Sequence, residues 1–529
     1  MLNFMKEKLE AVIMEALGAL GIEAGSVVLD RPADSLHGDY ATNAALVYGK
    51  KAGVVPRELA GKLVEIILET STEEIDKLEI AGPGFINIFL TDSALEQSVF
   101  QSEALNTRGG EKINIEFVST NPTGELHIGH GRSAFYGDTL ARVLALAGAD
   151  VTREFYINDS RESNQIKELG KTALGKGEQY KTPELEEKMS AMDFSGLPEE
   201  EAGVKLAGAV QASNRTFIGQ GLGVHFDVWY SEDAELRASG ANATMLALLK
   251  ERGVTYEKEG ALWLKTSEYG DDEDRVIVRS DGTMTYFIAD ITYHQKKFDR
   301  GFQTVINVWG ADHHGHVKRM QAVGRMLGWP KVPQTGADQP VIFIAQLVSL
   351  KEDGVSKKMS KRAGNVILLR DLVEEFGVDV VRWFFNEKAL STQMTFDMAL
   401  AREQSEKNPV YYVQYAHARL ASISEKTKGL AEARATEFTE LIKTPSARAL
   451  AAKITEFPEV VAGVARDYNV QGLTNYAAAL ANIANAYYRD VRVVHDEGYD
   501  SGALALGLRA KETLAQVLNL LGISAPEKM

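Results

Sequence analysis

The stretch Asn121–Ser133, "NPTGELHIGHGRS", joins a strand pattern to a helix pattern and thereby decides the fold class. The preceding residues 112–120, "KINIEFVST", alternate apolar and polar side chains, which is typical of a strand. The following residues 133–150, "SAFYGDTLARVLALAGAD", carry apolar residues at helical spacing. A strand, a glycine-rich turn and a helix together indicate the first unit of a parallel α/β sheet.

Two histidines, His127 and His130, lie three residues apart on this turn, so both imidazoles can face one anion. A helix amino terminus at such a junction also offers free backbone N–H groups to a phosphate. The glycines around the histidines allow a close approach to the backbone: Gly124, Gly129 and Gly131. Taken alone, the pair could instead bind zinc or be structural, although the sequence lacks the Glu of an H-E-x-x-H site.

A second unit of the same sheet is predicted at residues 304–328, "TVINVWGADHHGHVKRMQAVGRMLG". Its apolar run ends in a polar turn at Gly310 and Asp312, after which a helix pattern resumes. Between the two units lies a segment rich in Glu and Lys, residues 167–221 approximately, which indicates a helical insertion with solvated faces.

A basic segment, residues 356–366, "SKKMSKRAGNV", follows the apolar strand pattern "VIFIAQLVSL". It concentrates four cationic side chains: Lys357, Lys358, Lys361 and Arg362. Lysines on a glycine-tipped loop can close over a polyphosphate and neutralise the charge that develops as pyrophosphate leaves. The same cluster could also be an ordinary solvated surface loop.

The sequence predicts an α/β multidomain protein in three blocks. Residues 1–108 form an amino-terminal α+β domain, with a strand in "AGPGFINIFL". Residues 109–400 form a Rossmann-like domain with a parallel sheet and the helical insertion. Residues 401–529 repeat apolar positions at i, i+3 and i+4, which predicts an all-α helical bundle.

Composition excludes several classes of protein. With 45% hydrophobic and 25% charged residues, the chain has a globular composition, and no apolar run is long enough to span a bilayer. The absence of cysteine excludes disulfides and thiolate metal sites and suits a reducing compartment. The formal net charge is −16, yet residues 401–529 contain 15 Lys and Arg against 15 Asp and Glu, so this block does not share the acidic excess. Because polyanion binding needs only a local basic face, a nucleic-acid partner is not excluded.

The motifs "HIGH" and "KMSK", in this order on an α/β framework, resemble the signature of class I aminoacyl-tRNA synthetases. Further stretches resemble the arginyl-tRNA synthetase family of bacterial type, over nearly the whole chain: "HGDYATN", "AGPGFIN", "FDVWYSE", "SDGTMTYFIADITYH", "VINVWGADHHGH" and "NPVYYVQYAHAR". The resemblance implies ATP-dependent attachment of L-arginine to tRNA(Arg) through an arginyl-adenylate. It also implies that the first block contacts the outer corner of the tRNA and that the last block binds the anticodon.

The resemblance places the arginine substrate at four residues: Asn121, Glu232, Tyr286 and Asp290. Asn121 would contact the α-amino group and the other three the guanidinium. The chemistry agrees, because a planar guanidinium with five donors calls for carboxylates in a forked arrangement. Tyr286 and Asp290 are four residues apart and would share one face of a helix. Either carboxylate alone could be an ordinary surface group.

For ATP, the resemblance assigns the phosphates and departing pyrophosphate to His127, His130, Lys358 and Lys361. It extends the ATP site to Gly129, Gly310, Asp312 and Ser360. Mg²⁺ would accompany ATP with few protein ligands, and no dedicated metal site is expected. One departure from the family pattern is Arg362, which stands where "KMSKS" ends in Ser.

The last block interleaves aromatics and cations that could stack on unpaired tRNA bases: Tyr411, Tyr412, Tyr415, His417 and Arg419. Tyrosines at helical spacing could equally belong to the core. We further expect a monomer in the cytoplasm without membrane contact. Two alternatives remain open: a class I synthetase for glutamate or glutamine, which would require a cationic pocket, and an inactive tRNA-binding paralogue, which should have lost the histidines or lysines.

Overall fold

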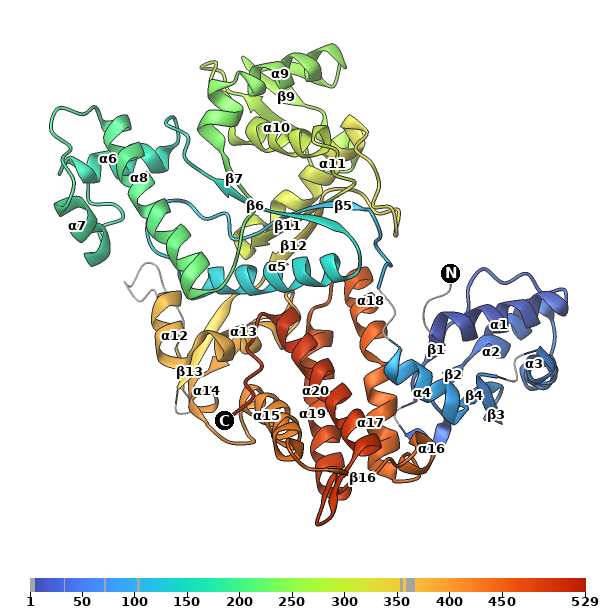
Figure 1. Cartoon of the computed structure of the whole chain (residues 1–529). Coiled ribbons are helices and arrows are strands. Elements are labelled where there is room, and N and C mark those ends of the chain that lie inside the picture. Colours follow the sequence, from blue (N-terminus) through green and yellow to red (C-terminus); the bar gives the residue numbers. More distant parts are fainter. Residues whose placement is uncertain (1–4, 33, 71–72, 102–104, 353–354, 358–366) are drawn as a thin grey trace.

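The computed structural model describes residues 5–32, 34–70, 73–101, 105–352, 355–357 and 367–529. Figure 1 shows a domain with a central sheet, drawn from cyan to yellow, that lies on a helical bundle, drawn in orange and red. A small amino-terminal domain, drawn in blue, flanks the bundle. The α/β multidomain fold predicted from the sequence is therefore confirmed.

The central sheet has five parallel strands in the order β12-β11-β5-β6-β7. Its strands are β5 (Lys112–Glu116), β6 (Asp150–Ile157), β7 (Val228–Ser231), β11 (Thr304–Gly310) and β12 (Val341–Ala345). From β5 the chain runs outward through β6 to β7 on one side, and later through β11 to β12 on the other. The strand order therefore reverses between β5 and β11, which is where open α/β sheets bind ligands.

Helices cover both faces of this sheet. Helix α5 (Ile128–Leu146) lies between the sheet and the bundle, whereas α10 (Tyr286–Asp299) and α11 (Val317–Leu327) lie on the opposite side (Figure 1). Gly137 allows α5 to approach β5, because a Cβ at this position would overlap the buried ring of Phe117.

Two insertions project from the sheet. The first contains α6 (Asn164–Ala173), α7 (Pro183–Ser190) and α8 (Glu199–Thr216), which ends in a π-helix, η2 (Phe217–Gly221). It is helical as predicted, but it also has a core of its own around Ile166, Leu169 and Leu206. The second consists of α9 (Ala241–Glu251) and an antiparallel sheet of β8 (Thr255–Lys258), β9 (Ala261–Leu264) and β10 (Arg275–Val278).

A connecting module follows β12. It contains β13 (Val348–Glu352), β14 (Val355–Lys357), β15 (Met394–Asp397), α12 (Leu369–Phe376), α13 (Val378–Asn386) and α14 (Met398–Arg402).

The bundle contains α15 (Pro409–Thr427), α16 (Phe438–Leu441), α17 (Pro445–Thr455), α18 (Phe457–Asp467), α19 (Gln471–Asp490) and α20 (Ser501–Leu521). It is not purely helical, because it also holds a sheet of three short strands: β16 (Glu432–Arg434), β17 (Val494–His495) and β18 (Gly498–Asp500). Strands of two or three residues are too short to show an alternating pattern.

The amino-terminal domain packs its helices on one antiparallel sheet, in the order β1-β2-β4-β3. Its elements are α1 (Met5–Ala19), β1 (Leu29–Asp30), β2 (Tyr40–Thr42), α2 (Ala44–Ala52), α3 (Pro56–Thr70), β3 (Ile75–Ala81), β4 (Phe85–Leu90) and α4 (Asp92–Phe100). Polar contacts fix it to the bundle: Arg31 pairs with Glu459 (2.6 Å), and Arg448 pairs with Asp39 (3.1 Å).

Candidate active site

The turn after β5 has a strained backbone. Val118 has a φ of 70° and Ser119 a φ of 34°, both in the left-handed region that L-residues rarely adopt, a β-branched residue least of all. Neighbouring elements hold the turn in place. The Val118 N–H donates to Ser133 Oγ of α5 (2.9 Å), and the Tyr156 N–H of β6 donates to Ser119 Oγ (3.1 Å). Such strain, imposed by surrounding structure, is concentrated at functional sites in proteins.

The two histidines of the "HIGH" turn begin helix α5. His127 is the N-cap: its Nδ1 accepts from the Gly129 N–H (3.1 Å), and His130 Nδ1 accepts from the His127 N–H (3.1 Å). The two imidazoles are stacked, with ring centroids 3.7 Å apart. A Cβ at Gly129 would press against the His127 ring, so the glycine permits this geometry. The prediction that both rings share one face is confirmed.

The chain that follows the basic segment is joined to the "HIGH" turn by backbone hydrogen bonds. The Ile128 N–H donates to the Ile367 carbonyl (3.1 Å), and the Leu369 N–H donates to the Leu126 carbonyl (2.8 Å). Residues 358–366, which include the predicted Lys358, Ser360, Lys361 and Arg362, lie outside the described residues. The described chain just beyond this segment is nevertheless adjacent to the histidines.

Two carboxylates lie close together at the same edge of the sheet. Glu232 follows β7 and is buried, and Asp290 is partly buried on α10. Burial, together with the negative charges of Glu232 and Glu116, raises the pKa of Asp290 to about 7. Burial also raises the pKa of Glu232, despite an ion pair with Arg237 (3.0 Å). A site that pushes two carboxylate pKa values upward is suited to bind a cation.

Helix α10, which carries Tyr286 and Asp290, is anchored to the sheet by buried ionic contacts. Lys297 is fully buried and donates to Glu116 Oε2 of β5 (2.8 Å) and Asn307 Oδ1 of β11 (3.1 Å). Arg300 donates two hydrogen bonds to Glu154 of β6 (2.6 and 3.0 Å). Although burial alone would raise it, Lys297 and Arg300 hold the pKa of Glu154 below its usual value.

A cleft of about 300 Å³ opens beside Asp290 and Tyr286. Besides Thr285, its other polar lining residues are cationic or can become so: Arg275, Arg279, His316 and Arg319. The cleft therefore carries both signs of charge. Sequence reasoning missed these four residues, because they come from two separate segments, 275–279 and 316–319, and no single motif groups them.

The remaining predicted site residues lie at or just after the ends of strands β5 and β11 or, for Tyr286, at the start of α10. Asn121 follows the strained turn and is exposed, and Tyr286 is 45% exposed with its hydroxyl accepting from the Asn164 N–H (3.4 Å). Gly310 ends β11, next to the exposed Asp312. A Cβ at Gly310 would lie 2.7 Å from Asp312 Oδ1, so the glycine allows this turn.

The predicted aromatic positions of the bundle form a partly exposed stack on α15 and α19. The rings of Tyr411 and Tyr415 are parallel, with centroids 6.3 Å apart. The Arg419 guanidinium lies 4.6 Å from the centroid of the Tyr415 ring and 5.0 Å from that of Tyr488. The sequence analysis missed Tyr488, which lies on the other helix.

Two further positions of the bundle differ in exposure. Tyr412 is partly buried, and its hydroxyl donates to Asn482 (3.3 Å). His417 is 2% exposed, and its Nδ1 lies 2.8 Å from the Pro526 carbonyl. The structure therefore places His417 inside the bundle, where it faces the carboxyl-terminal segment instead of solvent, and we remove it from the surface predicted for tRNA.

Within the described part of the chain, no group of three or more His, Asp or Glu side chains could hold a metal ion. No described helix is long and apolar enough to cross a membrane.

Three family models match the chain. The "Arginyl tRNA synthetase N terminal domain" matches residues 4–90, "tRNA synthetases class I (R), catalytic domain" matches 92–165 and 220–410, and "DALR anticodon binding domain" matches 413–529. The chain is 40% identical to Arginine--tRNA ligase 1 of Halalkalibacterium halodurans, with 99% of each chain covered. It is 38% identical to Arginine--tRNA ligase of Bacillus subtilis, with 100% of this chain and 99% of the other covered.

Solved structures share the fold. Thermus thermophilus arginyl-tRNA synthetase matches with a TM-score of 0.79 and 22% identity, over 99% of this chain and 100% of the other. The enzyme of that name from Plasmodium falciparum also matches with a TM-score of 0.79, at 16% identity and with both chains fully covered.

Proposed function

Because the chain belongs to the arginyl-tRNA synthetase family, we propose that it attaches L-arginine to tRNA(Arg), using ATP and forming arginyl-adenylate. The observation that supports this proposal is the pair of electrostatically interacting carboxylates, Glu232 and Asp290, in a sheet domain whose stacked-histidine turn lies at the switch point of the sheet. Arginine is the amino acid whose side chain needs two acidic partners.

The acidic pair also accounts for specificity. A neutral amino acid would supply no cation to Asp290, and lysine has a single ammonium that cannot bridge both groups. Because the cleft beside Asp290 also holds arginines, its charge alone does not decide against glutamate or glutamine, and the two arginine--tRNA ligase relatives support arginine instead. Asn121, on the exposed turn after β5, would contact the α-amino group, and Tyr286 would contact the guanidinium together with Glu232 and Asp290.

In the first step, the arginine carboxylate attacks the α-phosphate of ATP in line, and pyrophosphate leaves. Positioning and charge stabilisation suffice for this step, so no general base is needed. We assign His127, His130 and the Gly129 turn to the phosphates, because they lie at the amino terminus of α5. Gly310 and Asp312 at the end of β11 would hold the ribose. Lys358, Ser360 and Lys361 would stabilise the departing pyrophosphate.

In the second step, the 2′-hydroxyl of the terminal tRNA adenosine attacks the adenylate, forming the ester and releasing AMP. The stack of Tyr415 and Arg419, with Tyr412 nearby, would bind unpaired anticodon bases. Mg²⁺ would be held mainly by ATP oxygens, because it keeps several of its waters and prefers phosphate oxygens. We further propose that the protein acts as a monomer in the cytoplasm.

The direct test is formation of labelled ATP from pyrophosphate with each amino acid in turn, with and without tRNA. Exchange should occur with arginine. Exchange with a different amino acid, or none with arginine when tRNA is present, would contradict the proposed function.

Arginine binding should weaken as the pH falls, because Asp290 titrates near neutrality. Its raised pKa of about 7 means that the carboxyl is protonated and neutral below this pH. A guanidinium binds the ionised form, so the Kd of arginine should rise about tenfold between pH 8 and pH 6. Calorimetry in two buffers of different ionisation enthalpy should detect release of about one proton at pH 6.

The matched control for this titration is Asp290→Asn, which removes the titrating group. The variant should bind arginine weakly and with little pH dependence over the same range. An unchanged tenfold slope in the variant would mean that another group titrates.

The histidine turn has a capping role and a proposed chemical role, which substitution of His127 can separate. Asn is a good N-cap, so His127→Asn should keep the stability of α5, whereas His127→Ala should cost about 1 kcal/mol of stability. Both variants should lower kcat by about a hundredfold, because each removes the imidazole from the phosphate site. Thermal unfolding and steady-state kinetics measure the two effects. A His127→Asn variant with wild-type kcat would show that His127 is only a cap.

A further inference from the structure

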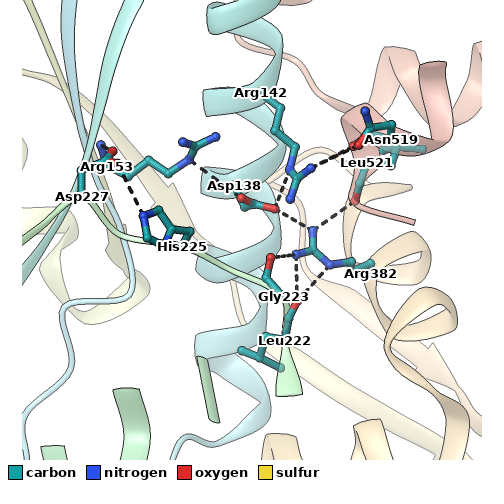
Figure 2. Close-up of polar contacts among 10 residues, drawn as sticks. All are labelled: Asp138, Arg142, Arg153, Leu222, Gly223, His225, Asp227, Arg382, Asn519 and Leu521. Carbon is teal, nitrogen blue, oxygen red and sulfur yellow. Dashed lines mark hydrogen bonds and ion pairs between the residues drawn. The ribbon is translucent and has the colours of Figure 1, made fainter. Parts of the chain in front are cut away.

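Arg382, on α13, is a buried cation that joins segments far apart in the sequence (Figure 2). It is 1% exposed. Its Nη1 donates to Asp138 Oδ2 (2.8 Å) and the Leu521 carbonyl (3.1 Å). Its Nε and Nη2 donate to the Leu222 carbonyl (3.2 and 2.8 Å), and Nη2 also donates to the Gly223 carbonyl (3.1 Å). One guanidinium thus makes five hydrogen bonds to four acceptors.

The four acceptors belong to three different parts of the molecule. Asp138 lies on α5, the helix that begins with the "HIGH" turn. Leu222 and Gly223 follow the π-helix η2 and lead into β7, directly before Glu232. Leu521 ends α20, the last helix of the bundle.

Arg382 itself belongs to the connecting module that follows β12. In that module, Ile367 and Leu369 are hydrogen-bonded to the "HIGH" turn. The parts proposed to hold ATP, arginine and tRNA therefore meet at a single side chain.

Neighbouring residues are arranged around this contact. Arg142, one turn along α5, donates to the same Asp138 Oδ2 (3.0 Å) and to the Asn519 carbonyl of α20 (3.3 Å), as Figure 2 shows. Gly522 ends α20 with a φ of +69°, and a Cβ there would overlap the Arg382 guanidinium. The end of α20 can approach Arg382 of α13 this closely because the position is glycine.

These contacts fix position more than they stabilise the fold. A buried ion pair contributes little net stability compared with apolar side chains of the same volume, because desolvation offsets the attraction. Five directional hydrogen bonds, however, allow only one relative placement of the segments they join. His127 lies 11 residues from Asp138 along a continuous helix, roughly 16 Å away, so a displacement of α5 at Asp138 carries the histidines with it.

We propose that Arg382 is a positioning residue for the transfer of arginine to tRNA. It fixes the position of the bundle, which would bind the tRNA, relative to α5 and to β7, the strand before Glu232. This placement would bring the tRNA 3′ end to the adenylate. The inference rests on the proposed function. A displacement of the reacting groups by about 1 Å can lower the rate of a reaction about a hundredfold, so a small shift of the bundle should lower the rate of transfer.

The test replaces Arg382 with lysine, which keeps the charge beside Asp138 but cannot reach all four acceptors. The kcat of tRNA arginylation in Arg382→Lys should fall about ten- to a hundredfold. The KM values of arginine and ATP, and the Kd of an isolated RNA hairpin with the tRNA(Arg) anticodon loop, should change less than about threefold, since each binds within one part.

Arg108→Lys is the matched control. Arg108 is equally buried, pairs with Glu111 (2.8 Å) and also contacts the bundle, through the Ala465 carbonyl (3.0 Å) and Tyr468 (3.1 Å). It donates to none of the four acceptors of Arg382. All assays run well below the melting temperature of each variant. Arg108→Lys should lose stability to a similar extent but keep its kcat within about threefold.

The outcomes separate the two claims. If the wild-type protein does not arginylate tRNA, the proposed function fails. If the wild type is active and Arg382→Lys keeps its kcat, or if Arg108→Lys loses as much kcat at an equal loss of stability, the positioning role is overturned. A drop confined to the kcat of Arg382→Lys supports it.

Discussion

Asp290→Asn should lower kcat/KM for arginine about a thousandfold, while the Kd of ATP stays within about twofold. Removing one partner of a buried charge pair costs about 3–5 kcal/mol, and about 4 kcal/mol corresponds to three orders of magnitude. The amide of Asn keeps the size of the carboxyl group but cannot neutralise the guanidinium. ATP is unaffected in this scheme, because its proposed contacts lie on α5 and at the end of β11. Steady-state kinetics with varied arginine and a separate ATP titration measure both quantities.

The matched control is Asp299→Asn, at the other end of the same helix, where an exposed carboxylate accepts from Gln295 (2.9 Å). It should change kcat/KM less than about twofold. A large loss of ATP affinity in Asp290→Asn would reassign that residue to the nucleotide.

Asp290→Asn should also stabilise the folded protein at pH 8. The folded-state pKa of Asp290, about 7, lies above the ordinary value of 3.8, so its ionisation opposes folding. The favourable contribution of the protonated form is present below about pH 4 and is lost as the pH rises through 7. A neutral Asn avoids this loss, which we expect to amount to about 1–2 kcal/mol for a partly exposed group. The Asp290 carboxylate would therefore lower the stability of the folded protein while it provides the charge that binds arginine.

The sequence predicted the main architecture because its strongest patterns are local. The strand before the "HIGH" turn, the turn itself and α5 follow each other within 35 residues, from Lys112 to Leu146. The spacing of Tyr286 and Asp290 predicted a shared face on condition that the segment is helical, and both residues lie on α10. Each of these features depends on residues close together in the chain.

Features that depend on tertiary contacts escaped prediction. The left-handed backbone at Val118 has no sequence signal, since valine disfavours it and Ser133 and Tyr156 of other elements hold it. The network around Arg382 joins residues far apart in the sequence, such as Asp138, which is 244 positions from Arg382. His417 was misplaced because helical spacing alone cannot tell which aromatic or imidazole side chain faces inward.

The hairpin of β8 and β9 was also not predicted, although its signal is local in the sequence. Its turn at Glu259 and Gly260 has φ values of 53° and 74°, both in the left-handed region, as in a type I′ turn. The pattern "YEKEGALWL" contains that turn between apolar residues, so a search for tight hairpins would have found it.

Lys297→Met should lower the free energy of unfolding of the sheet domain by about 3–5 kcal/mol, because it leaves the carboxylate of Glu116 buried without its cation. Lys297 is fully buried, bonds to Glu116 and Asn307, and also helps to hold Glu154 in its ionised form. Met has a similar length and packs where the lysine stem lies, so the loss reports charge and not volume. The double variant Lys297→Met with Glu116→Gln should recover at least half of the loss, since no unpaired charge remains. Urea unfolding followed by tryptophan fluorescence measures both, and a double variant no more stable than the single one would contradict the ion-pair explanation of how α10 is anchored.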